Sequence, residues 1–474
     1  MSQIFASKRA NLFVGGRGTK AGESDCGGGC TESFWEANED LSLIMGANGD
    51  CLNAAGTWNG SQTACTTQNE GGNLRVNYTN GFSNCVAGLL AYIEISFDPN
   101  YLSYTDKRYE VLTVDDDYIV IDLPYTSTSP TCDIKVGGAF QNMVTAINVV
   151  ISPVYNIIIY DNKDETLSGT ISPISCGVVG DDVHVTVWGF KTYVGDCDKG
   201  GPCYQNSLDA YAVGIDTDSK VNIDANDGAF DILTLDDKDS LEFRNIHFFN
   251  NSGTYDAVKF LNSPFDITFI NCAFNDVDEY FGGDQTGGFY CIDCYFGGAR
   301  DTTPSIPGAV NSYFLRCVFD GTGMTYAWGA GYEIYIDCLF LGGQYGIFPT
   351  YYIGLYNCVF YGQTTACIYL NYGMSLVYGY NNAFCPIAIS DYAVEIGASG
   401  GSISLTLECS CVYSIGNGPL TAMVNNVKTS KTYALPGTVI QEEPLFRSAA
   451  TNDFRLKAES PLLNAGVWTL GGII

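Results

Sequence analysis

The segment NDVDEYFGGD at residues 275–284 holds the acidic group best spaced to bind a cation. Asp276 and Asp278 alternate with Val277, so both carboxylates lie on one face of an extended chain. Together with Glu279 and Asp284 they could supply the oxygen ligands that Ca²⁺ prefers. The alternative, a solvated turn that follows a strand, is the interpretation that the sequence favours. Calcium is therefore the only cofactor that the sequence leaves open.

Two further carboxylates, Glu333 and Asp337, are candidates for acid–base catalysis. Glycoside hydrolases cleave sugar polymers with such a carboxylate pair, and Asp276, Asp278 and Glu279 could contribute to one. Histidine chemistry has only His184 and His247 to draw on, and no Lys or Arg occurs between Arg316 and Lys428. The sequence thus favours a protein that is not an enzyme, with a polysaccharide lyase or glycoside hydrolase as the alternative.

Aromatic residues form the other group with recognition chemistry. Tyrosines crowd the stretch from 326 to 413, and the candidates for a contact surface are Trp328, Tyr351, Tyr352 and Tyr372. A tyrosine offers a flat apolar ring with a polar tip, which suits sugar stacking and also suits subunit interfaces. Because few charges stand beside these tyrosines, a protein–protein face such as a trimer contact is favoured over sugar binding.

A repeat must position these residues. A short apolar strand that closes on Phe recurs from residue 241 to residue 384, in segments such as ITFINCAF (267–274) and IYIDCLF (334–340); the closing residues are Phe248, Phe274, Phe296, Phe319, Phe340, Phe360 and Phe384. These steps are too short for a β-α-β crossover, and they match one coil of a parallel β-helix. The repeat predicts an all-β fold, a right-handed parallel β-helix preceded by a small β-rich domain.

Cysteines mark the same repeat. The residue two before the Phe is cysteine in five successive coils: Cys272, Cys294, Cys317, Cys338 and Cys358. Side chains two apart in a strand point the same way, so we expect an inward stack of thiols beside a stack of Phe rings. Buried cysteine behaves as a small hydrophobe, which predicts a reduced structural ladder that is neither a disulfide framework nor a metal site. An outward polar stack, including Asn271 and Asp337, should stand beside the adjoining turn.

Three stretches resemble the pectate-lyase-like superfamily of right-handed β-helices, in the form found in phage tailspikes and other virion proteins. Residues 135–147 (KVGGAFQNMVTAI) resemble its opening cap, residues 185–260 its first coils, and residues 443–466 (EPLFRSAATNDFRLKAESPLLNAG) its closing coil. The resemblance implies a β-helix over 132–474, with a cap at about 135–150 and a closing coil at about 441–470. The Gly-His-Gly of the family's hydrolases is absent here, and the middle coils lack the basic residue that its lyases need.

Residues 1–131 lack the repeat. The stretch RYEVLTVDDDYIVIDLPY (108–125) reads as two strands joined at Asp115-Asp116-Asp117. It loosely resembles modules that attach phage proteins to one another, which implies that residues 1–131 bind other virion proteins. Cys26 and Cys30 are spaced to ligate a metal, but one or two disulfides among the five cysteines of this region are favoured over zinc, and inert thiols are favoured over both.

Composition limits the partners. A net charge of −30 argues against nucleic acid, whose phosphates need clustered Lys and Arg. No stretch reads as a secretory signal or a membrane span. We therefore expect a virion structural protein, a tailspike, fibre or capsid-attached spike, made in the host cytoplasm. It could form a homotrimer, although a monomeric solenoid capped at both ends is also physically sound, and it could contact host polysaccharide. A polysaccharide depolymerase on the same scaffold is the alternative, and a secreted cellular carbohydrate-binding protein is the third.

Overall fold

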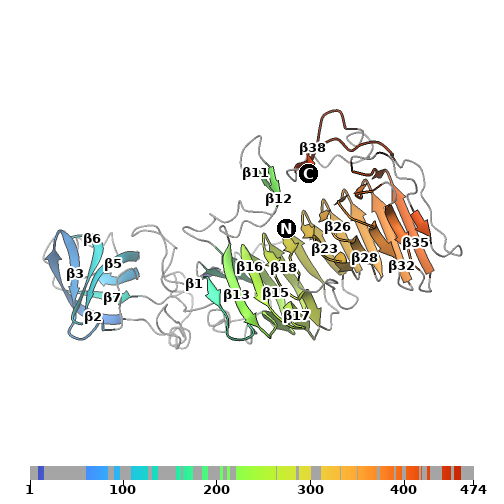
Figure 1. The fold of residues 1–474 in the computed structure, drawn as a ribbon. Helices are drawn as coiled ribbons and strands as arrows, with labels where there is room; N and C mark the ends of the chain where they lie inside the picture. Colours follow the sequence, from blue (N-terminus) through green and yellow to red (C-terminus); the bar gives the residue numbers. More distant parts are fainter. Residues whose placement is uncertain are drawn as a thin grey trace, which may run out of the picture. The chain divides into compact units, whose positions relative to one another are not determined.

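The computed structural model describes residues 9–14, 60–83, 90–96, 108–125, 131–136, 143, 156–161, 164–173, 184–189, 203–205, 211–213, 220–262, 264–283, 288–299, 311–330, 332–349, 351–370, 374–388, 391–397, 402–415, 418, 424–426, 440–449 and 453–460. The chain divides into two compact units (Figure 1). The first comprises Met1–Glu165, Pro173–Cys197 and Ser240–Glu242; the second comprises Thr166–Ser172, Asp198–Asp239 and Phe243–Ile474.

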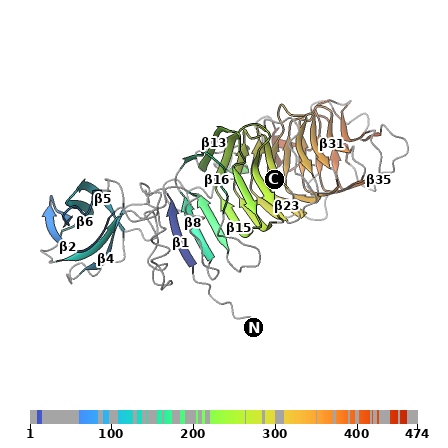
Figure 2. The ribbon, with the colours of Figure 1, turned by 90° about the horizontal axis from the view of Figure 1, so that it is seen from below.

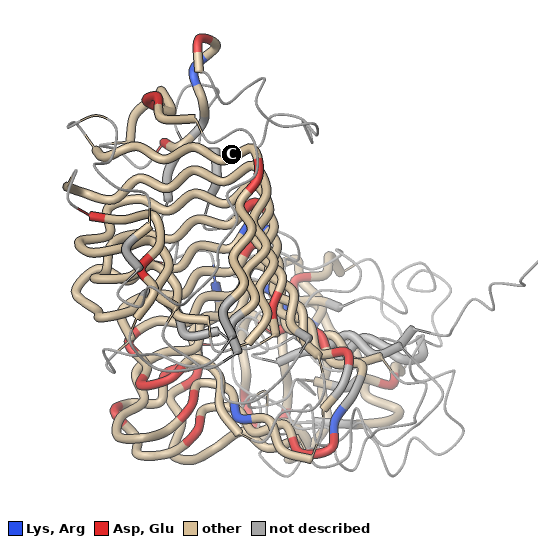
Figure 3. The backbone as a smooth tube through the Cα atoms, turned by 90° about the vertical axis from the view of Figure 1, so that its right-hand side faces the viewer, with Lys and Arg blue, Asp and Glu red and all other residues tan. Residues whose placement is uncertain are grey.

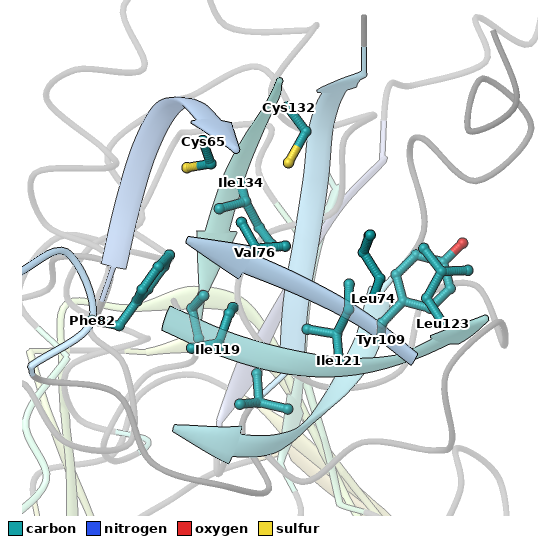
Figure 4. Packing of buried hydrophobic residues seen from close by; sticks show 12 residues of the cluster. Cys65, Leu74, Val76, Phe82, Tyr109, Ile119, Ile121, Leu123, Cys132 and Ile134 are labelled. Atoms are coloured by element: carbon teal, nitrogen blue, oxygen red, sulfur yellow. The ribbon is translucent and has the colours of Figure 1, made fainter. Parts of the chain in front are cut away.

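The first unit contains a closed antiparallel barrel with the strand order β2-β3-β6-β5-β4-β7. Its strands are β2 (Gly60–Glu70), β3 (Asn73–Asn77), β4 (Leu90–Ser96), β5 (Arg108–Asp115), β6 (Tyr118–Pro124) and β7 (Cys132–Val136). The expected pair at 108–125 is the hairpin of β5 and β6. Alternate residues point inward, and Val76, Ile119, Ile121 and Ile134 are fully buried among them (Figure 4).

The barrel ends later than the sequence suggested. Strand β7 closes it at Val136, whereas the boundary was expected at residue 131, because Ile134 and Val136 complete the barrel core. The same unit contains β1 (Arg9–Val14), β8 (Asn156–Asp161) and β10 (Val185–Gly189), which pair in parallel outside the barrel. Of the cap expected at about 135–150, Lys135 and Val136 belong to β7, and the rest apart from Met143 lies outside the described residues.

The second unit is a parallel β-solenoid, shown from two directions in Figures 1 and 2. Sheet I, as we name it, has the order β18-β21-β23-β26-β29-β32-β35. Its strands are β18 (Phe265–Ile270), β21 (Phe289–Ile292), β23 (Asn311–Leu315), β26 (Tyr332–Ile336), β29 (Tyr352–Tyr356), β32 (Met374–Tyr380) and β35 (Ser402–Glu408).

Sheet II carries the Phe repeat. It contains β13 (Val221–Gly228), β16 (Ile246–Asn251), β19 (Ala273–Asn275), β22 (Tyr295–Gly297), β24 (Val318–Asp320), β27 (Leu339–Leu341), β30 (Val359–Tyr361), β33 (Ala383–Cys385) and β36 (Cys411–Val412). The seven repeat Phe residues from Phe248 to Phe384 are register partners, and successive rings stack with centroids 4.4 to 5.3 Å apart. The prediction of a parallel β-helix is confirmed.

The third side of the solenoid is built in two pieces. Sheet IIIa contains β14 (Leu233–Asp236), β17 (Asp256–Leu261) and β20 (Glu279–Gly283). Sheet IIIb contains β25 (Tyr326–Ala330), β28 (Tyr345–Pro349), β31 (Ala366–Leu370), β34 (Tyr392–Ile396) and β37 (Val424–Asn426). The remaining described strands are β9 (Glu165–Thr166), β11 (Cys203–Gln205), β12 (Tyr211–Val213), β15 (Asp239–Arg244), β38 (Phe446–Ser448) and β39 (Asp453–Leu456).

One residue in a left-handed backbone conformation forms the corner between sheets I and II in each coil. In seven coils these residues are Asn245, Asn271, Asp293, Arg316, Asp337, Asn357 and Asn381, with φ between +52° and +58°, and in the next coil Cys409 takes this place with φ +50°. Asn and Asp tolerate this conformation better than other side chains. Their side chains also bond from coil to coil, as Asn381 Nδ2 to Asn357 Oδ1 at 2.7 Å shows. Arg316, an exception in type, donates two bonds of 2.7 Å to Asp293.

The cysteine ladder lies inside these corners. All five thiols are buried and free, and Cys317 Sγ contacts the carbonyl oxygens of Cys291 and Leu315 at 3.4 and 3.5 Å. Burial raises the pKa of the Cys272, Cys317 and Cys358 thiols well above the ordinary value. These thiols are therefore protonated packing groups at neutral pH.

Candidate functional site

Three carboxylates stack on successive coils of sheet IIIa. Asp256 in β17 and Glu279 in β20 are register partners. Leu233 in β14 is the register partner of Val258 in β17, and Asp231 and Asp256 each stand two residues before these partners. Asp231 is tied to this position because its Oδ1 accepts the Asp256 backbone N–H at 3.0 Å and its Oδ2 pairs with Lys259 Nζ at 3.1 Å. We call Asp231, Asp256 and Glu279 the carboxylate stack.

Asp256 is the perturbed member of the stack. It is 7% exposed, and its carboxylate lies against the Cα of Gly282, where a Cβ would stand 2.0 Å from the carboxylate atoms. Burial raises the pKa of Asp256 to about 7; the charges of Asp231 and Glu279 add to the rise, and Lys259 opposes it. A carboxyl group with a pKa near neutrality can hold a proton and release it, which is the requirement for a general acid.

The spacing of the stack also suits carboxylate chemistry. Neighbouring strands lie about 4.8 Å apart, and the two carboxylates of a retaining glycosidase lie about 5 to 5.5 Å apart. Sequence reasoning found Glu279 but missed Asp231 and Asp256. Asp256 follows Phe248 by eight residues and Glu279 follows Phe274 by five, so counting from the repeat does not align them.

The acidic segment at 275–284 is not brought together as one group. Asp276 takes a left-handed corner conformation with φ +52°. Gly298 occupies the equivalent position in the next coil. Asp278 is 8% exposed and its backbone N–H bonds Asn251 Oδ1, while Glu279 joins the carboxylate stack. Asp284 lies outside the described residues. No three His, Cys, Asp or Glu side chains in the described part of the chain are grouped to hold a metal, so calcium stays a prediction.

Glu333 and Asp337 do not suit the catalytic role expected of them. Glu333 points into the solenoid, is 1% exposed and accepts a hydrogen bond from the Tyr335 hydroxyl. Asp337 is a corner residue whose Oδ1 accepts Asn357 Nδ2 at 3.1 Å, and burial is the main cause that raises its pKa. The alternation in β26 turns Glu333 inward, because Tyr332, Ile334 and Ile336 occupy the outward positions.

Aromatic and aliphatic side chains cover the outward face of sheet I. Of the eight exposed large hydrophobic residues described, five lie here: Tyr290, Tyr313, Tyr332, Tyr351 and Leu376. Between them stand half-buried outward residues of the same kind: Ile292, Leu315, Ile334, Ile336, Tyr352, Tyr356, Tyr378 and Tyr380. No charged residue is among these outward residues. We call this surface, from β21 to β32, the tyrosine face.

Rings on the tyrosine face stack along the solenoid. Tyr290 and Tyr313 are register partners whose centroids lie 5.3 Å apart at 12°, and Tyr332 and Tyr351 lie 5.2 Å apart at 10°. In each pair, one face of each ring is covered by the other ring. In Figure 3, Asp and Glu appear at many points of the earlier coils, while long runs of the stacked later strands carry no charge.

The expected aromatic residues fall in different places. Tyr351 is on the tyrosine face at 40% exposure, and Tyr352 is half-buried beside it. Trp328 lies in β25 opposite Ile347, and Tyr372 lies outside the described residues. Sequence reasoning missed Tyr290 and Tyr313. Each stands directly before an inward residue of an aligned segment, Cys291 or Phe314, and this position could have indicated that both tyrosines point outward.

Comparison with known proteins gives little further guidance. No protein-family model and no curated protein matches the chain. Among solved structures, the chain is similar to the catalytic domain of GH87 alpha-1,3-glucanase in complex with nigerose, at 11% identity over 80% of this chain and 87% of that one, with a TM-score of 0.30. It is also similar to the catalytic unit of thermostable GH87 alpha-1,3-glucanase from Streptomyces thermodiastaticus strain HF3-3, at 11% identity over 79% and 90%, with a TM-score of 0.25.

These TM-scores are too low to carry an argument about activity, so the function must rest on the chain's own residues. No helix of the described residues is long and apolar enough to cross a membrane.

Proposed function

We propose that the chain is a structural and adhesive component of a phage particle. Its N-terminal region docks to other virion proteins, and its solenoid assembles with copies of itself and contacts host polysaccharide. The observation that carries this proposal is the tyrosine face, an exposed uncharged surface on a chain whose net charge is −30.

Charge makes the tyrosine face the natural contact between copies. Two chains that each carry −30 repel one another, and the repulsion is weakest where neither surface bears charge. Contiguous apolar patches on soluble proteins commonly mark interaction sites, and tyrosine is enriched in interface cores. A ring of copies about one axis would bury this face on every subunit, as in a homotrimer.

Ring orientation favours protein over sugar as the partner of this face. A pyranose stacks on the flat face of an aromatic ring, but Tyr290 covers Tyr313 and Tyr332 covers Tyr351. The rest of each ring and its hydroxyl group can instead pack against side chains and hydrogen-bond to them. Glycan contact is therefore assigned to another part of the solenoid.

Native mass spectrometry of the full-length chain tests the assembly. We expect a trimer for the wild-type chain and a monomer for the double substitution Tyr290→Glu and Tyr313→Glu, because facing carboxylates would be buried unpaired. Tyr78→Glu is the matched control, since Tyr78 is 41% exposed on the barrel. A wild-type monomer at micromolar concentration, or a trimer that survives the double substitution, would contradict this role of the face.

A glycoside hydrolase is the second candidate, and the carboxylate stack is the observation that favours it. Asp256 would act as the proton donor, since its pKa is raised to about 7, and Asp231 or Glu279 would act as the ionised partner. The test is release of reducing ends from capsular polysaccharide of the host. Hydrolysis should fall about 100-fold or more in Asp256→Asn. It should be unchanged in Asp236→Asn, a control at the exposed end of β14. Absence of release by the wild-type chain would exclude this candidate on that substrate.

A further inference from the structure

A hollow opens on the outward flank of sheet II where a large side chain is followed by a small one. Leu341, Tyr361 and Cys385 are register partners in β27, β30 and β33. The Tyr361 ring has a leucine on one side along the solenoid and only a thiol on the other. The space above Cys385 is therefore left unfilled, and the Tyr361 ring stands beside it.

The closing segment of the chain roofs this hollow. Tyr413 and Ile415 form a wall in the next coil, while Leu445, Phe446 and Ala449 cover it from above. The half-open space has a volume of about 190 Å³, and Glu443 is one of its lining residues. All of these residues belong to the second unit.

The roof is held in a strained conformation. Leu445 has φ +54°, a left-handed backbone that a branched side chain rarely adopts. Its carbonyl oxygen accepts the Lys457 backbone N–H at 2.8 Å, and the carbonyl oxygen of Pro444 accepts a hydrogen bond from the buried Ser460 hydroxyl. Strain that the surrounding structure maintains in this way is found at ligand sites more often than elsewhere.

Size and lining indicate one six-membered ring as the occupant. An apolar cavity of about 150 Å³ accepts a benzene molecule, so the present space accommodates one ring with small substituents. Its apolar lining includes Phe446 and Ile415, and the lining residues with a polar or charged group are Tyr361, Tyr413 and the exposed Glu443. An apolar lining with a few polar groups fits a ring that has C–H faces and hydroxyl edges.

We propose that this pocket binds one neutral sugar ring, a terminal or branch residue of the polysaccharide that the solenoid contacts. The proposal rests on the glycan contact in the proposed function. The ring lies against Tyr361 over Cys385, and its hydroxyls donate to Glu443. A negatively charged sugar is disfavoured because Glu443 and the chain's net charge of −30 repel it.

The experiment is ligand-detected NMR and calorimetric titration of the full-length chain with single neutral hexoses and N-acetylhexosamines. Glucuronate, choline and phenol serve as the charged and aromatic comparisons. We expect at least one neutral sugar to bind with a Kd on the order of 1 mM, the range of one small ring. Glucuronate should bind at least about tenfold more weakly than its neutral counterpart, because it adds a like charge.

Two filling substitutions locate the ligand. Cys385→Leu fills the hollow from the floor and Ala449→Phe fills it from the roof, and each should weaken binding by about tenfold or more since the ring no longer fits. Glu443→Gln should weaken it about three- to tenfold, because the hydrogen bond to the sugar loses its charge. Glu442→Gln, the neighbouring exposed carboxylate whose side chain does not line the pocket, should leave the Kd unchanged.

The pocket proposal is overturned if no neutral sugar binds. It is also overturned if a folded filling variant, judged by an unchanged Tm, binds as the wild type does, or if choline or phenol is the ligand that the filling substitutions remove. Native mass spectrometry of the same variants separates the two proposals. A chain that forms trimers but binds no sugar refutes the pocket alone, whereas a monomer whose sugar binding depends on Cys385 and Ala449 refutes the role of the tyrosine face alone.

Discussion

The corner residues show how one backbone angle selects the side chain. Eight corners have φ between +50° and +58°, and all but Arg316 and Cys409 are Asn or Asp. Asn357 sits in the middle of this ladder: it donates to Asp337 Oδ1 at 3.1 Å and accepts from Asn381 Nδ2 at 2.7 Å. The residue is therefore held by both its backbone conformation and its side-chain bonds.

Substitutions at Asn357 should separate these two contributions. Asn357→Gly keeps the left-handed backbone and loses the hydrogen bonds, whereas Asn357→Ala loses both. We expect Asn357→Ala to be the less stable by about 1 kcal/mol, the ordinary cost of a left-handed conformation with a Cβ. Urea unfolding followed by tryptophan fluorescence measures the difference, and equal stability of the two variants would show that the backbone angle is not maintained in solution.

Asp256 links stability to pH in the direction set by its raised pKa. The folded-state pKa is about 7 and the ordinary value is 3.8, so the folded chain binds the proton more tightly. The stabilisation from this proton is complete below pH 4 and is lost as the pH rises through 7. Its size is on the order of 4 kcal/mol, because each pKa unit corresponds to about 1.4 kcal/mol.

Asp256→Asn should therefore remove much of the pH dependence. We expect the wild-type Tm to fall between pH 5 and pH 8, and the Asn variant to change less over that interval and to exceed the wild type at pH 8. Asp236→Asn, at the exposed end of β14, should follow the wild-type curve. Parallel curves for Asp256→Asn and the wild type would mean that Asp256 is ionised in the fold at ordinary pH.

At the scale of strands, the sequence predicts what repeats and misses what varies. The Phe and Cys positions recur because each coil places one ring and one thiol in the same interior site, so sheet II and the cysteine ladder could be aligned by counting. The carboxylate stack could not be aligned by counting, because the loops between sheets II and III differ in length. Glu333 was misjudged for another reason: alternation within β26 alone does not show that the buried face accepts a carboxyl group beside Tyr335.

The thiols of the cysteine ladder should be unreactive toward alkylating reagents in the folded chain. Its thiols are buried, and burial raises the pKa of Cys272, Cys317 and Cys358, so little thiolate is available to react. We expect iodoacetamide at pH 8 to leave these three thiols unmodified in the native chain and to alkylate them in urea, as peptide mass spectrometry would show. Cys409, which is only half-buried, is the internal comparison. Rapid native alkylation of Cys317 would contradict the buried ladder.

At the scale of the whole molecule, charge and apolar surface are separated. The chain carries 52 acidic and 22 basic residues, yet the outward residues described on the tyrosine face are uncharged. A free monomer would expose Tyr290, Tyr313, Tyr332, Tyr351 and Leu376 to water at 38% to 44% of their surface. In the proposed assembly, association of copies through this face would remove that surface from water while the charged coils stay solvated.

The proposed function assigns the chain to a phage particle, and quantitative mass spectrometry of density-purified particles tests this central claim most directly. The proposed function predicts that the chain is retained through high-salt washing, at a fixed copy number per particle that is a multiple of three. Absence of the chain from the particles, or its loss in the wash together with soluble host proteins, would contradict a particle-borne β-helix.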